Sequence, residues 1–155
     1  MIEAWRICQR RLVKRALDGE AAFLYGGRWN SPGTRVVYLA SSLALAMLEM
    51  LVHVEDGHEL LVERYVAVKV ELDAALVKVP ARLPRRWHND PPPRSAAQFG
   101  DGWVASGSSL ALRVPSAIIP SEPNYLLNPS HREMRRLRIG KPLSFSFDSR
   151  LAPKV

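Results

Sequence analysis

The sequence is poor in cysteine, since Cys8 is the only one among 155 residues. An internal disulfide is therefore impossible, which excludes a disulfide-rich secreted scaffold and favours a reducing cytoplasm. Cys8 fits a small apolar filler of a strand better than a catalytic nucleophile. A long apolar run is also lacking, because Glu49 and His53 interrupt the longest one, 43–54, and a membrane span needs roughly 20 residues. With no signal-peptide pattern at the N-terminus, we expect a soluble cytoplasmic protein without membrane contact.

Metal-binding and common catalytic motifs are absent as well. The four histidines form no HExxH pair and have no cysteine partners at ligand spacing; they are His53, His58, His88 and His131. No Gly-x-Ser-x-Gly, Gly-Lys-Ser/Thr or dinucleotide-binding glycine pattern occurs, and no helix-turn-helix is evident. The sequence thus predicts neither a metal ion nor a resident cofactor, and it does not indicate a Ser-His-Asp hydrolase.

Positive charge is present in excess. The 22 Lys and Arg residues against 15 Asp and Glu residues give a net charge of +7. Segments 1–15, 78–94 and 131–141 each hold five basic residues against one acidic residue, whereas 16–77 holds four against nine. The three basic segments are either solvated surface or a binding surface for an acidic protein or a nucleic acid. Aromatic residues make up only 8%, and no RNA-binding motif occurs, so a nucleic-acid-binding or RNA-cleaving protein is the more distant alternative.

The apolar pattern predicts one α+β domain over residues 1–155, because strands outnumber helices and do not alternate strictly with them. The predicted strands are 4–8, 35–40, 64–72, 110–119, 125–128 and 143–147. The predicted helices are 10–17, 41–55 with a serine cap, and 95–106, which Gly100 and Gly102 weaken. Residues 20–33 are expected to be irregular, and 80–94, with five prolines, to be a loop. Pro115 requires a sheet edge or a bulge in its strand.

The predicted helix 41–55 carries two polar exceptions. It is apolar nearly all round and is therefore expected to be buried, apart from Glu49 and His53, which lie four residues apart on one face. A carboxylate on a buried helix is costly unless it is paired or faces a cavity. Two interpretations stay open: a structural pair of Glu49 with His53 or with an arginine, or a carboxylate directed into a functional site.

A glycine-rich segment offers a second candidate. Gly26 and Gly27 precede Arg28, and flexible glycines let the backbone come close to a ligand. The planar guanidinium of Arg28 suits a phosphate, although Gly-Gly-Arg is often only a turn.

Four segments of the chain belong together by order and spacing. They are Trp5-Arg6; YGGRWNSPG at 25–33; VVYLA at 36–40, followed by AMLE at 46–49 and His53; and SLALRVPSAIIP at 109–120, followed by NYLLNP at 124–129. Together they resemble the RES domain, a family named for its Arg, Glu and Ser, over nearly the whole chain. One departure is Ile7, where some relatives have a tyrosine, so any aromatic contact from that position is missing here.

The resemblance implies a toxin of a bacterial RES–Xre type II toxin–antitoxin system. The implied fold is that of ADP-ribosyltransferases, with a mixed β-sheet core and flanking helices. The implied activity is consumption of NAD by cleavage of the nicotinamide–ribose bond, through hydrolysis or phosphorolysis, and the alternative is transfer of ADP-ribose to a protein. The implied partner is a Xre-family antitoxin, which would leave DNA contact to that partner. NAD would be the substrate, with no cofactor and no metal.

The resemblance also implies a pocket, in which Glu49, Arg28 and Ser116 would be catalytic. Glu49 would stabilise positive charge that develops on the ribose, as carboxylates do in glycoside hydrolysis. The implied NAD-binding residues are Arg6 and Arg28 at the diphosphate, Tyr38 or Trp29 stacking on the substrate, Ser116 at the nicotinamide ribose or amide, and also His53 and Asn124.

Overall fold

Two long antiparallel strands form the most extensive pairing of the sheet in the computed structural model, which describes residues 1–151. β1 (Ile2–Gln9) pairs with β3 (Tyr65–Leu72) along its whole length, with Ile2 opposite Leu72 and Gln9 opposite Tyr65. Apolar residues alternate along β3 because successive side chains point to opposite faces of a sheet. This pair is the frame on which the remaining strands are arranged.

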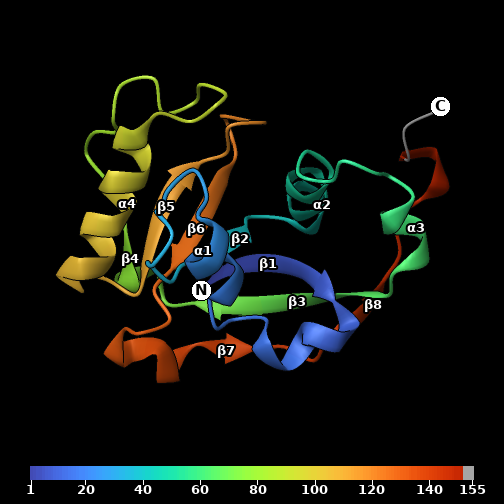
Figure 1. Ribbon diagram of the computed structural model, residues 1–155. Coiled ribbons are helices and arrows are strands. Elements are labelled where there is room, and N and C mark those ends of the chain that lie inside the picture. Colours follow the sequence, from blue (N-terminus) through green and yellow to red (C-terminus); the bar gives the residue numbers. More distant parts are fainter. Residues whose placement is uncertain (152–155) are drawn as a thin grey trace.

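The part of the chain that the structure describes forms one mixed sheet of eight strands (Figure 1). Their order is β4-β5-β6-β2-β1-β3-β7, and β8 also pairs with β3. The other strands are β2 (Val37–Ala40), β4 (Val77–Lys78), β5 (Ala111–Pro115), β6 (Pro123–Leu127), β7 (Arg138–Ile139) and β8 (Leu143–Phe145). All pairs are antiparallel except β4 with β5. The predicted α+β class is therefore confirmed.

Helices flank the sheet at both ends (Figure 1). The α-helices are α1 (Glu20–Tyr25), α2 (Leu43–Leu51), α3 (Glu59–Val62) and α4 (Arg94–Ser106). The 3-10 helices are η1 (Arg10–Arg15), η2 (Ala74–Leu76), η3 (Arg132–Arg136) and η4 (Ser149–Leu151). α4 packs on β5 and β6, while α2 and α3 pack on β1 and β3. None of the helices within residues 1–151 has the length and apolar character of a membrane span.

Several element predictions need correction. Residues 20–33 are not irregular throughout, because the first six form α1, where Glu20 favours the helix N-terminus. The predicted helix 10–17 is a 3-10 helix that ends at Arg15. The predicted strand 110–119 ends at Pro115, beyond the two residue pairs that β4 makes with β5. β4 does not reach Pro115, so no carbonyl of β4 is left without a donor by the missing N–H of Pro115. The strand therefore requires no bulge.

The helix with the candidate glutamate is shorter and more exposed than predicted. α2 begins after Ser42, whose hydroxyl accepts a hydrogen bond from the Leu45 N–H at 3.0 Å, and it ends at Leu51 instead of Glu55. Only Leu45 and Ala46 are fully buried, because one face alone packs on the sheet. The expectation of burial all round is wrong.

The core confirms the interpretation of the lone cysteine as a filler. Cys8 packs with Ala4, Val66 and Val68 on one face of the β1–β3 pair. Burial raises the pKa of its thiol, which disfavours the thiolate that a nucleophile needs.

α4 is held against the glycine-rich turn by a close backbone approach. A Cβ on Gly100 would lie 1.6 Å from the carbonyl oxygen of Trp29, so no side chain fits there. A Cβ on Gly102, in the same helix, would meet no atom within 4 Å. Gly100 is thus a packing requirement, whereas Gly102 only weakens the helix.

Replacing these two glycines by alanine should have opposite effects. We expect Gly100→Ala to destabilise the fold by about 3 kcal/mol, since a methyl group must push α4 away from the turn. Gly102→Ala should stabilise the fold by up to about 1 kcal/mol, the usual gain in an exposed helix interior. Urea unfolding of both variants measures the difference, and equal free energies of unfolding would contradict the close approach.

Candidate active site

Three elements converge on the carboxylate of Glu49. Its Oε1 accepts a hydrogen bond from Ser116 Oγ at 2.8 Å and another from Asn124 Nδ2 at 2.7 Å. Ser116 directly follows β5, and Asn124 lies in β6 opposite Ala40 of β2. Glu49 is half-buried, so these donors replace part of the water that a carboxylate loses on burial. Within residues 1–151 both hydrogen bonds go to Oε1, and Oε2 has no protein donor.

The Ser116 hydroxyl has used its hydrogen-bonding capacity. It is fully buried, donates to Glu49, and accepts from the backbone N–H groups of Ile118 and Ile119, both at 3.1 Å. A hydroxyl has one donor and two acceptor sites, and all three are occupied here. Ser116 therefore orients the carboxylate, and no donor remains for a bound molecule.

Asn124 differs from Ser116 because one of its atoms has no partner. Its Nδ2 donates to Glu49, while its Oδ1 is buried without a hydrogen bond. A buried acceptor without a donor costs free energy comparable to a lost hydrogen bond. A hydroxyl or amide of a bound molecule beside Glu49 would supply the missing donor.

Arg6 lies where the sheet opens between β1 and β2. These strands share a single residue pair, Trp5 with Ala40. Beyond it, Arg6 Nη1 donates to the Tyr38 carbonyl at 3.2 Å, in place of a backbone N–H. The opening therefore holds a guanidinium directly beside the pair that links β1 to β2.

Arg6 forms no ion pair within residues 1–151, although burial, which lowers the pKa of its guanidinium, is partly opposed by the negative charge of Asp18, which raises it. Its Nε is buried without a partner, and no carboxylate of the described residues forms an ion pair with it. Burial lowers the pKa of the Arg6 guanidinium, which nevertheless stays charged at neutral pH because its ordinary value lies so far above 7. A partly buried guanidinium without a carboxylate in contact is costly, so an anionic ligand would find a prepared position here.

The segment Gly27 to Asn30 is a tight turn held by Tyr38. Gly27 N–H donates to the Asn30 carbonyl at 3.0 Å, and the Tyr38 hydroxyl accepts from Trp29 N–H at 3.0 Å. The same hydroxyl donates to Asn30 Oδ1 at 2.7 Å. A Cβ on Gly27 would lie 2.6 Å from the Tyr38 hydroxyl oxygen, which explains the glycine. Burial raises the pKa of Tyr38, so the hydroxyl stays neutral and serves as a donor.

Asn30 is a supporting residue to which the sequence assigned no role. It is fully buried, and its Nδ2 donates to the carbonyl oxygens of Ala22 at 2.8 Å, Thr34 at 3.0 Å and Ser31 at 3.2 Å. The Asx-type residue in a Gly-rich turn was the available signal, because asparagine side chains bond nearby backbone. Its partners became visible only in the fold.

The residues between the glycines and Asn30 contact a distant loop. Arg28 Nη1 donates to the carbonyl oxygens of Trp87 and Asn89, both at 2.7 Å. Trp29 is buried and stacks on Trp87 with ring centres 5.9 Å apart. Trp29 is thus a core residue, and stacking on a substrate is not open to it. Arg28 holds the 80–93 loop while its Nε and Nη2 have no protein partner within residues 1–151.

The structure does not place His53 with the other predicted site residues. His53 follows α2 and is exposed, and among the described residues Glu49 is bonded to Ser116 and Asn124 instead. The pairing of Glu49 with His53 is therefore not formed. Ile7, at the position of the missing tyrosine, is buried in the core beside α2.

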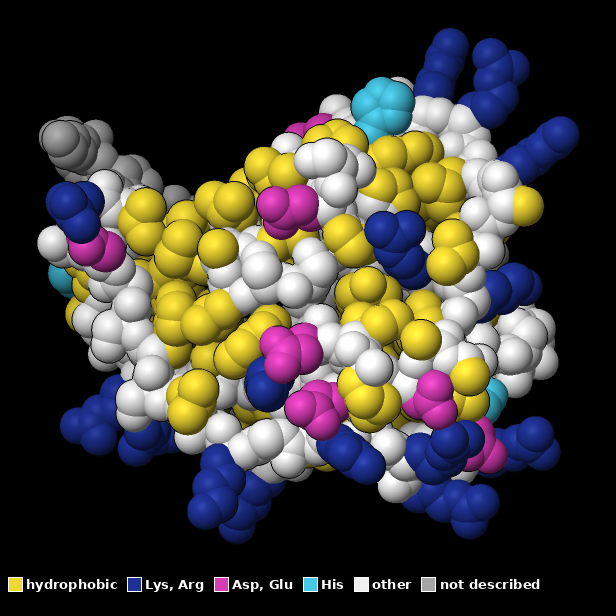
Figure 2. Space-filling view, turned by 180° about the vertical axis from the view of Figure 1, so that it is seen from behind, with side chains coloured by type: hydrophobic (Ala, Val, Ile, Leu, Met, Phe, Trp, Pro, Cys, Tyr) yellow, Lys and Arg dark blue, Asp and Glu magenta, His cyan; other side chains and the backbone are white. Residues whose placement is uncertain are grey.

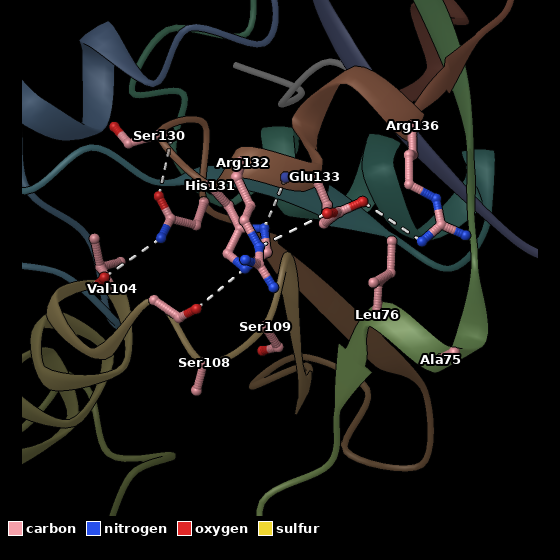
Figure 3. Close-up of a pocket in the computed structure, with 12 residues that line it drawn as sticks. Ala75, Leu76, Val104, Ser108, Ser109, Ser130, His131, Arg132, Glu133 and Arg136 are labelled. Carbon is pink, nitrogen blue, oxygen red and sulfur yellow. Dashed lines mark hydrogen bonds and ion pairs between the residues drawn. The ribbon is translucent and has the colours of Figure 1, made fainter.

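A hollow of about 650 Å³ lies elsewhere and contains none of the predicted site residues (Figure 3). Its lining includes Ser109 ahead of β5 and Asn128 after β6, at the ends of these strands that face away from Ser116 and Asn124. Its charged groups bond one another, as in Arg136 with Glu133, and His131 bonds the Gly107 carbonyl. Within residues 1–151 no three His, Cys, Asp or Glu side chains gather as metal ligands.

Known proteins resemble this chain over most of its length. The RES domain family matches residues 3–148. A protein named Toxin Res from Yersinia enterocolitica is 42% identical, over 95% of this chain and 97% of its own. A Prs ADP-ribosylating toxin from a Sphingobium species is 38% identical, over 97% of each chain. In a crystal structure of the Mycobacterium tuberculosis (M.tuberculosis) MbcT-MbcA toxin-antitoxin complex, a chain shares the fold, with a TM-score of 0.73 and 18% identity over 93% of this chain and 84% of that one. Through the family match and these relatives, the chain is a member of the RES domain family.

Proposed function

We propose that this protein is the toxin of a toxin–antitoxin pair and cleaves the nicotinamide–ribose bond of NAD. The observation that carries the proposal is the Glu49 carboxylate, oriented by two donors through one oxygen and open at the other. The cation of Arg6, which has no carboxylate in contact within residues 1–151, supports an anionic substrate in the same region. Relatives named as toxins support the toxin role, and the one named as ADP-ribosylating supports a reaction of the same class.

The chemistry follows from charge development. Breaking the bond to nicotinamide builds positive charge on the ribose, and a fixed carboxylate nearby stabilises this charge more than the neutral ground state. Glu49 Oε2 is the oxygen that would face the ribose. Nicotinamide leaves as a neutral group, so the reaction requires no proton donor at the leaving nitrogen.

The remaining residues would hold the substrate. Arg6 and the two unoccupied nitrogens of Arg28 would contact the diphosphate, which suits planar guanidinium donors. Asn124 Oδ1 would accept from a ribose hydroxyl. Ser116 would position Glu49 instead of contacting the ribose or amide, which revises the role that the resemblance implied. The ring of Tyr38 would border the nicotinamide site.

The acceptor of ADP-ribose would be water, phosphate or a protein side chain. Protein modification is the second candidate, favoured by the 38% identity to an ADP-ribosylating toxin. The proposed partner is a Xre-family antitoxin, supported in its general nature by the complex in which the structural neighbour was solved. We place the activity in the cytoplasm, where NAD is available to a toxin.

Glu49→Gln should remove activity and leave the fold intact. The amide keeps the size of the carboxylate but loses its charge, so we expect NAD cleavage to fall by about 100- to 1000-fold. Release of nicotinamide by the purified variant measures this. Glu59→Gln, on α3, is the matched control and should retain normal turnover. Normal NAD loss with Glu49→Gln would overturn the assignment.

Arg6→Gln should separate substrate binding from stability. Loss of a charged donor to the diphosphate should raise the KM for NAD by about tenfold or more. The melting temperature should change little, because the loss of the hydrogen bond to the Tyr38 carbonyl is offset by removal of a partly buried cation that has no carboxylate in contact. Arg113→Gln, at an exposed position of β5, is the control. An unchanged KM would contradict the phosphate contact.

Ser116→Ala tests orientation of the carboxylate. Because Ser116 touches Glu49 and backbone only, we expect kcat to fall by about tenfold, as for a lost charge-assisted hydrogen bond, while the KM for NAD stays within about twofold. A substrate contact of Ser116 would instead raise KM. Steady-state kinetics of the wild type and the variant distinguish the two roles.

A further inference from the structure

One of the three basic segments combines free charge with a position beside the candidate site. Residues 80–94 contain four arginines, Arg82, Arg85, Arg86 and Arg94, against a single acidic residue, Asp90. All four are exposed. None of them forms an ion pair within the described part of the chain, whereas Arg15, Arg35 and Arg136 do. We call residues 80–94, which carry these four arginines, the arginine loop.

The backbone of the arginine loop is held in place. Arg28 Nη1 bonds two of its carbonyl oxygens, those of Trp87 and Asn89. Trp87 stacks on Trp29, and Leu83 packs against the same core cluster. Five prolines further restrict the segment. Because the backbone of the loop is already ordered, binding of a partner does not include the entropic cost of ordering it.

The arginine loop borders the residues that carry the catalytic proposal. Pro80 and Leu83 of this segment line a groove together with Pro115 and Pro123. The groove also holds one cation, Arg113, and one carboxylate, Glu122, and the four arginines lie outside it. Pro115 precedes Ser116, and Pro123 precedes Asn124, the two donors to Glu49. The other two basic segments, at η1 and at η3 with β7, lie on the opposite side of the molecule (Figure 1).

The chemistry of the surface favours a polypeptide over a single-stranded nucleic acid. Single-stranded nucleic acids bind through bases stacked on exposed aromatic rings. The one tryptophan of the arginine loop, Trp87, already stacks on buried Trp29, so it offers no free face on that side. Carboxylates need only guanidinium groups. Basic side chains project from the upper right of the surface in Figure 2, which corresponds to the upper left of Figure 1, where segment 80–94 lies.

We propose that the arginine loop docks an acidic segment of a partner protein at the rim of the candidate active site. The docking requires only the surface arginines and is separate from NAD cleavage. An acidic polypeptide held there would lie next to the segment that carries Ser116 and Asn124.

Fluorescence anisotropy of labelled decaglutamate tests the proposal on the full chain. Arg82→Glu, Arg85→Glu and Arg94→Glu combined should weaken binding by at least about tenfold at low salt. The matched control reverses three basic residues at the opposite side, Arg135, Arg138 and Lys141, and should change binding by less than about twofold. Arg86 is left unchanged in both variants, so that each reverses three charges.

Two outcomes would overturn the proposal, and two further measurements control for the fold of the variants. Equal losses in both triple variants would show attraction to net charge only and would overturn it. Tighter loop-dependent binding of labelled decathymidylate than of decaglutamate would also overturn it, in favour of a nucleic acid. NAD turnover without peptide should be unchanged in the loop variant, which shows an intact fold and separates this test from the proposed activity. If the charge reversals unfold the protein, the same three positions changed to glutamine give the readout.

Discussion

The carboxylate of Glu49 imposes the constraint around which this site is built. A charged group on an otherwise apolar helix must recover the hydrogen bonds that it loses to burial. Ser116 and Asn124 supply them, and each comes from a different strand end. The carboxylate therefore ties α2 to β5 and β6, and the helix that caps the sheet is also the element that places the reactive group.

A second set of contacts ties the glycine-rich turn to the rest of the fold. The Tyr38 hydroxyl, from β2, donates a hydrogen bond to Asn30 in the turn. Asn30 itself bonds backbone carbonyls before and after the turn, and α4 packs closely against the turn at Gly100. Arg28, at the corner of the turn, extends the contacts to the 80–93 loop. One short motif thus joins the sheet, a helix and a loop, so its residues serve structure as much as substrate.

Unbalanced polar groups mark where a ligand would complete the structure. Three buried side-chain atoms of the described residues lack partners, and two of them, Nε of Arg6 and Oδ1 of Asn124, belong to residues of the candidate site, whereas the third, Oε1 of Gln9, does not. Of the two in the site, one is part of a cation and the other is an acceptor beside a carboxylate. This combination matches an anionic substrate with hydroxyl groups, and the larger hollow near η3 offers no such mismatch because its charges are already paired.

The sequence by itself determined the fold class and the long strands, and it singled out Glu49 as a candidate for the site. Alternating apolar residues identified β3, a serine cap identified the start of α2, and Glu49 stood out as the one carboxylate on that apolar helix. Only the tertiary structure decided what these residues do. Hydrogen-bond partners come from segments far apart in the chain, so no local pattern could show that all hydrogen-bonding positions of the Ser116 hydroxyl are occupied. For the same reason, no local pattern could show that Trp29 is buried or that His53 lies apart from Glu49. The shorter α2 and the close approach at Gly100 were hidden for the same reason, because packing between distant elements overrides local preference.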